Sequence, residues 1–74
     1  MSDNFDDFDR AAEEDAFNYL WLNHPTLAKA ITKAINKGET PETVRQRANL
    51  NFGPYRDALT KRCELAARYM GRGK

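Results

Sequence analysis

Proline and glycine divide this sequence into four stretches, and each stretch has the apolar spacing of a helix. The chain has three prolines and four glycines, and most of them fall between the stretches, at Pro25, Gly38, Pro41, Gly53 and Pro54. A proline keeps the residue before it out of the helical region, and a glycine readily takes the left-handed conformation that ends a helix. No stretch alternates apolar and polar residues for long, so strands are not expected. The sequence therefore predicts an all-α fold, a compact bundle of about four short helices.

We expect these helices over residues 9–22, 25–37, 41–50 and 54–70. Thr40 suits an N-cap, Pro41 suits the first helical position, and Gly38 suits the position after a helix end. Apolar positions at helical spacing give the expected core: Phe8, Ala12, Ala16, Tyr19, Leu20, Leu27, Ile31, Ala34, Ile35, Val44, Ala48, Tyr55, Leu59, Cys63, Ala66 and Met70.

The length of the chain limits its function as well as its fold. Seventy-four residues provide one small core, which excludes a two-domain enzyme and a Rossmann or barrel fold. No nucleophile–base constellation, metal-ligand spacing or phosphate loop is visible, so we expect a non-enzymatic protein without a cofactor. The single cysteine, Cys63, lies on an apolar stripe and is expected to pack in the core, and the single histidine, His24, is expected near a helix cap.

Apolar runs, the charge of the N-terminus and the cysteine count indicate where the protein is located in the cell. No apolar run exceeds the four residues 19–22, against about 18 for a membrane span. The acidic N-terminus is unlike the basic start of a signal peptide, and one cysteine cannot form an internal disulfide. We therefore expect a cytoplasmic protein that has no membrane partner.

The charges are distributed unevenly along the chain. Residues 1–16 carry seven acidic side chains and one arginine, a net charge of −6, whereas residues 17–74 carry a net charge of +7. This asymmetry suggests nucleic acid as a partner, or partners of opposite sign at the two ends. We accordingly divide the chain into an acidic, aromatic N-terminal arm (1–8), a single helical domain (9–70) and a flexible basic tail (71–74).

Residues 34–48 contain the most specific motif. Ala34, Gly38 and Val44 have the spacing of the packing residue, the turn glycine and the recognition-helix anchor of a helix-turn-helix. The run from Gly38 through Thr40, Pro41, Thr43, Val44 and Arg45 resembles the turn and recognition-helix start of LuxR-type response regulators and of sigma-factor region four. Lys37 and Glu39 differ from that pattern, because family members usually have apolar residues there. A simpler interpretation also stays open, in which Gly38, Thr40 and Pro41 only end one helix and start the next.

The resemblance implies DNA as a partner and assigns roles to individual residues. Thr40 and Thr43 would reach a phosphate or a base edge, and Arg45, Gln46 and Asn49 would face the major groove. A lysine at every fourth position would add non-specific phosphate attraction. A solvated basic face is the alternative explanation of these lysines. One copy would bind operator DNA weakly, so a DNA-binding form is expected to be a homodimer or to dock on another protein. The lysines are Lys29, Lys33 and Lys37.

A competing hypothesis is a protein-binding regulator. Five of the eight aromatic residues lie within the first 21 positions, among seven acidic residues. Aromatic anchors surrounded by carboxylates suit docking onto a basic partner. A chain of this kind looks similar to phage-encoded regulators that bind host machinery such as bacterial RNA polymerase. The residues expected to contact the partner are Phe5, Asp6, Asp7 and Phe8, while Phe17, Tyr19 and Trp21 could instead fill the core. A third arrangement, in which the acidic segment folds over the basic face, also fits the charges.

Overall fold

The fold is all-α, as predicted. The computed structural model describes residues 2–51, 53 and 55–72, with side chains for residues 10–50, 53 and 55–71. Four helices follow one another along the chain: α1 (Ser2–Asn23), α2 (Pro25–Asn36), α3 (Pro41–Asn51) and α4 (Arg56–Arg72). No strand occurs in the part of the chain that the structure describes. None of the described helices is long and apolar enough to cross a membrane.

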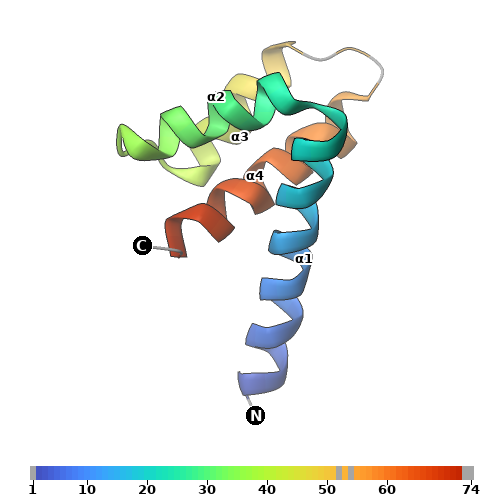
Figure 1. The fold of residues 1–74 in the computed structure, drawn as a ribbon, viewed down its shortest axis with the longest axis vertical. Coiled ribbons are helices and arrows are strands. Elements are labelled where there is room, and N and C mark those ends of the chain that lie inside the picture. The colour runs from blue at the N-terminus through green and yellow to red at the C-terminus, as the bar shows by residue number, and fades with distance from the viewer. Residues whose placement is uncertain (1, 52, 54, 73–74) are drawn as a thin grey trace.

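Helix α4 contacts all three of the other helices. It packs mainly against α1 on one side and α3 on the other, and α2 lies across α1 and α4 (Figure 1). The first turns of α1 extend away from the rest of the bundle and end at the bottom of the view (Figure 1). Because residues 2–23 form one continuous helix, the acidic segment does not fold over the lysines of α2. The third arrangement considered from the sequence is therefore wrong.

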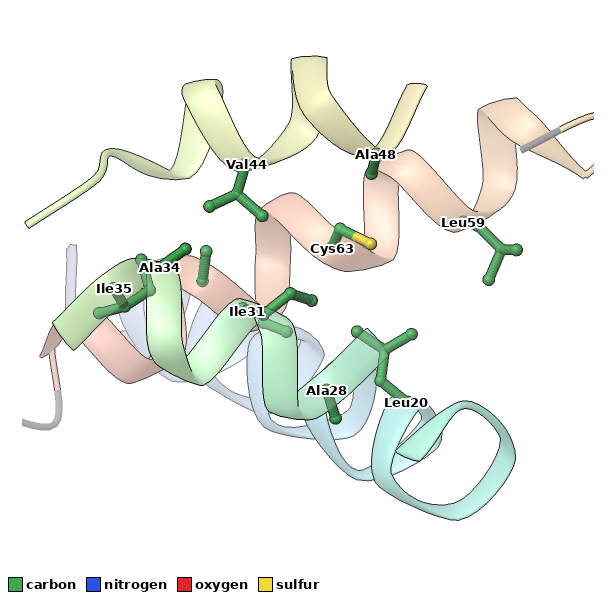
Figure 2. Packing of buried hydrophobic residues seen from close by; sticks show 11 residues of the cluster. Leu20, Ala28, Ile31, Ala34, Ile35, Val44, Ala48, Leu59 and Cys63 are labelled. Atoms are coloured by element: carbon green, nitrogen blue, oxygen red, sulfur yellow. The ribbon is translucent and has the colours of Figure 1, made fainter. Parts of the chain in front are cut away.

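The core lies where the four helices meet. Leu20 and Cys63 are fully buried, and Val44 points from α3 toward α2 (Figure 2). Alanine is the commonest residue of the buried cluster. The predicted core positions on α2, α3 and most of α4 are confirmed, and Met70 and Leu27 pack at the edge. The buried cluster contains Leu20, Ala28, Ile31, Ala34, Ile35, Val44, Ala48, Leu59, Cys63, Ala66 and Ala67.

Three predicted core residues lie elsewhere. Ala12 is exposed and Glu13 is fully buried. The side of α1 that packs in the bundle carries residues 13, 16 and 20 rather than residues 12, 16 and 19. Tyr19 is 37% exposed for the same reason. Tyr55 is 73% exposed, because it precedes the first residue of α4 and does not follow the spacing of that helix. The side chain of Phe8 lies outside the described residues.

The helix boundaries differ from the predictions mainly at the two ends of the chain. Helix α1 begins at Ser2 rather than near Asp9, and α4 continues beyond Met70 to Arg72. Residues 2–8 thus belong to the first helix, and residues 73–74 of the predicted tail lie outside the described part of the chain. The α1–α2 corner follows the prediction, since Pro25 begins α2 and His24 occupies its N-cap.

Candidate nucleic-acid interface

A tight turn joins α2 to α3, and backbone hydrogen bonds satisfy the end of α2. Gly38 has φ +94°, the left-handed conformation expected of a residue that ends a helix. Its N–H donates to the Ile35 carbonyl at 2.9 Å, and the Glu39 N–H donates to the Ala34 carbonyl at 3.1 Å. No other described residue has a positive φ. Gly38 therefore forms the turn at the position that the sequence predicted.

The start of α3 is capped as predicted. The backbone N–H of Thr43 donates to Thr40 Oγ1 at 3.2 Å, which satisfies one of the free donors of the helix N-terminus. The two threonine hydroxyls also lie 2.9 Å apart and share a hydrogen bond. Pro41 begins the helix, where its missing N–H costs nothing. The structure thus brings Thr40 and Thr43 together at one exposed helix end.

The buried side of α3 packs mainly against α4 and also meets α2. Val44 and Ala48 are both buried, and Val44 points toward Ala34 (Figure 2). Ala34 and Val44 line one small, mostly apolar hollow of about 100 Å³ between the two helices. The residues whose spacing suggested a helix-turn-helix therefore pack at the α2–α3 contact, and the resemblance to that motif stays a prediction.

All of the predicted nucleic-acid-binding side chains are exposed, but they form separate groups. Those of α3 are one or two positions away from Val44 and Ala48 and so lie off its buried side. Those of α2 lie on the side opposite its buried residues. Lys29 and Lys33 border a shallow hollow with Trp21, and Lys37 is the C-cap next to the turn. The α3 group is Arg45, Gln46 and Asn49.

A contact across the turn was not predicted from the sequence. Arg47 Nη2 lies 2.8 Å from Glu39 Oε1, and Arg47 Nη1 donates to Glu39 Oε2 at 3.1 Å. This two-pronged ion pair ties the turn to the second turn of α3. It also offsets the charge of Glu39, which would repel a nearby phosphate. The two residues are eight positions apart, so no helical spacing rule could identify the pair.

The structure supports no catalytic role for Cys63. The thiol is fully buried in the core cluster, and desolvation by that burial raises its pKa from 9.0 to about 11. A thiol in this environment is a poor nucleophile. The ring of His24 lies beside the ring of Tyr19, with the two ring centroids 6.0 Å apart. Among the described residues, no cluster of three His, Cys, Asp or Glu side chains could hold a metal ion.

The aromatic residues near the end of α1 are divided between core and surface. Phe17 packs against the core and contacts Tyr69 of α4, with ring centroids 5.4 Å apart. Trp21 meets the Phe17 ring edge-on and keeps 37% of its surface exposed. The side chains of Phe5, Asp6, Asp7 and Phe8, the predicted partner contacts, lie outside the described side chains, although their backbone belongs to α1.

We compared the chain with models of known protein families, with curated proteins and with solved structures, and none of them matches it.

Proposed function

We propose that this protein is a small, non-enzymatic regulator of transcription that binds duplex DNA through α2, the turn and α3. The observation that carries this proposal is the two-sided construction of α3. Val44 and Ala48 hold its inner side, while Arg45, Gln46 and Asn49 are presented to solvent next to a capped, exposed N-terminus. A helix in the major groove needs this arrangement of a buried anchor and free polar side chains.

The proposed contacts follow from side-chain chemistry. Arg45 would donate two hydrogen bonds to a guanine, and Gln46 or Asn49 would pair with an adenine. The exposed hydroxyls of Thr40 and Thr43 at the start of α3 would meet a phosphate, where the helix dipole also favours negative charge. The exposed lysines of α2 would add attraction that is independent of sequence. The Glu39–Arg47 ion pair supports this role because it lowers the negative charge beside the turn.

A single copy presents only one short recognition helix, and its net charge is close to neutral, +1. We therefore propose that the DNA-bound form is a homodimer on two half-sites about one helical turn of DNA apart. Two recognition helices on one operator would reach the affinity expected of specific binding.

The test is fluorescence anisotropy with a labelled duplex of mixed sequence, starting at about 50 mM salt because phosphate contacts weaken as salt rises. Changing Arg45 and Gln46 together to Ala should weaken binding by about 1–3 kcal/mol per lost base contact. Arg56→Ala is the matched control, since it removes one exposed positive charge from the first residue of α4. Lys33→Ala should weaken binding to all sequences about equally and reduce the salt slope by about one.

The Arg56→Ala control distinguishes contacts made by α3 from a general effect of charge. Equal losses for Arg56→Ala and for the α3 double variant would mean that only overall charge matters. Absence of duplex binding by the wild-type protein near 50 mM salt would contradict the proposal altogether.

A second candidate function is docking on a bacterial protein such as RNA polymerase, in the manner of a phage-type inhibitor. The observation in its favour is that the first turns of α1 project from the bundle (Figure 1). Residues 5–8 lie in this segment, so Phe5, Asp6, Asp7 and Phe8 would be offered on a projecting helix. Purified bacterial RNA polymerase should then bind the full chain and lose most of its affinity for a chain that lacks residues 1–8. Equal affinity for both chains would exclude this use of the segment.

A further inference from the structure

A second surface hollow lies where the end of α1, the α1–α2 corner and the first turns of α4 meet. Its volume is about 270 Å³, close to the lower end of the range for small-ligand sites. No residue of α3 contributes to it, so it is separate from the proposed duplex interface. Its lining consists of two tyrosines, a histidine, an arginine and two apolar residues: Tyr19, His24, Tyr55, Ala58, Leu59 and Arg62.

The arginine of this hollow is held in place by a ring. The guanidinium carbon of Arg62 lies 3.6 Å from the centroid of the Tyr19 ring. A guanidinium stacked in this way keeps its N–H donors free at the edge of its plane, where they suit a phosphate or carboxylate. Two other basic residues of α4, Lys61 and Arg68, instead pair with Glu64. Their side-chain nitrogens lie 3.9 and 3.6 Å from the carboxylate oxygens. Among the described side chains, no carboxylate pairs with Arg62.

The rings of the hollow are available to a planar ligand. Tyr55 is 73% exposed, and the side chain of His24 makes no capping hydrogen bond. The rings of His24 and Tyr19 are 6.0 Å apart and tilted by 44°, so they do not stack face to face. Ala58 and Leu59 provide an apolar base. Exposed rings beside an arginine are the composition of sites that stack unpaired bases and hold the adjacent phosphate.

We propose that this hollow binds one unpaired nucleotide, with its phosphate on Arg62 and its base against Tyr55. The volume accommodates one ring system rather than a longer ligand, and the excess of positive charge over residues 17–74, +7, favours a polyanion. This activity goes beyond duplex recognition by α3, because it needs an exposed base face that a paired base in a duplex does not offer. The nucleotide is either free or part of a single strand, and the test separates these two sources.

The experiment is fluorescence anisotropy of the full-length protein with a labelled single strand of mixed sequence, on the order of ten nucleotides long, at about 50 mM salt. Tyr55→Ala should weaken binding about fivefold or more, since stacking on an aromatic ring is a main source of such affinity. Arg62→Gln should weaken it at least as much. Lys61→Gln is the matched control, because it removes the same charge from the adjacent residue outside the hollow, and its effect should be clearly smaller. Tyr55 is largely exposed, so its removal should leave the thermal unfolding midpoint almost unchanged.

A competition experiment between the labelled strand and a free mononucleotide identifies the source of the nucleotide. A free mononucleotide that displaces the strand at millimolar concentration would identify the hollow as a mononucleotide site, whereas no displacement would identify a single strand as the ligand. The α3 double variant at Arg45 and Gln46 should bind the single strand as the wild type does, which distinguishes failure of this site from failure of the duplex interface.

Three results would overturn the proposal. The first is unchanged binding by Tyr55→Ala, and the second is an equal loss for Lys61→Gln and Arg62→Gln. The third is no binding of strand or mononucleotide by the wild type. Binding of a glutamate-rich peptide with the same dependence on Tyr55, in place of the strand, would overturn it in favour of a protein partner.

Discussion

Replacement of Val44 tests how α3 is held against the bundle. Val44 is 5% exposed, so Val44→Ala removes two buried methyl groups worth about 0.8 kcal/mol each. The existing hollow of about 100 Å³ beside it would grow rather than close, and alanine would return about 0.5 kcal/mol through its higher helix propensity. The net loss should be about 1–2 kcal/mol. Val44→Ile should do the opposite and gain up to about 0.8 kcal/mol, because its extra methylene enters the hollow.

The assay is urea unfolding followed by circular dichroism at the helical minimum. A domain of this size has a total stability of about 4–11 kcal/mol, so the expected loss for Val44→Ala is a large part of it. Val44→Asp should prevent folding, since it buries an unpaired charge. The double change of Arg45 and Gln46 to Ala is the exposed control and should cost under about 0.5 kcal/mol. If Val44→Ile destabilises the protein as much as Val44→Ala does, α3 is not packed as described.

Three further predictions use the same unfolding measurement. Gly38→Ala should cost about 1 kcal/mol through backbone conformation alone, because φ is +94° and an added Cβ would meet nothing within 4 Å; no loss would contradict the left-handed turn. Burial raises the pKa of Cys63 to about 11 from 9.0. The stability that the buried neutral thiol contributes is therefore complete below pH 9, and it is lost as pH rises toward 11 because the thiol ionises first in the unfolded chain. The stability difference between wild type and Cys63→Ala should therefore change above pH 9, and a constant difference up to pH 11 would contradict it. Deletion of residues 1–8 should leave the core folded, because the buried apolar cluster begins at Leu20, and loss of the cooperative transition would show that Phe5 or Phe8 belongs to the core.

Local signals in the sequence predicted the helices and the turn well. Pro25, Gly38, Thr40 and Pro41 act through the conformation of their own backbone or through bonds to near neighbours, so their effects can be read from short stretches. The buried sides of α2 and α3 also followed from spacing within one helix. For this reason the proposed duplex interface consists of residues that were identified from the sequence alone.

Contacts between distant parts of the chain could not be predicted in this way. The burial of Glu13 instead of Ala12 depends on which line of α1 packs inside the bundle, and both lines have helical spacing. Tyr19 and Arg62 meet only because α1 and α4 pack side by side. The exposure of Tyr55 depends on where α4 begins, and helix starts are the least certain part of any pattern. The second hollow was therefore visible only in the structure.

The most direct test of the proposed DNA-binding surface is a map of it by NMR. Amide chemical shifts of the isotope-labelled full-length protein would be followed while a mixed-sequence duplex is added at about 50 mM salt. The largest changes should fall within residues 40–49, at the start and outer side of α3, with smaller changes at Lys29, Lys33 and Lys37. Changes confined to α1 and α4, or no changes at all, would contradict the claim that α3 binds DNA.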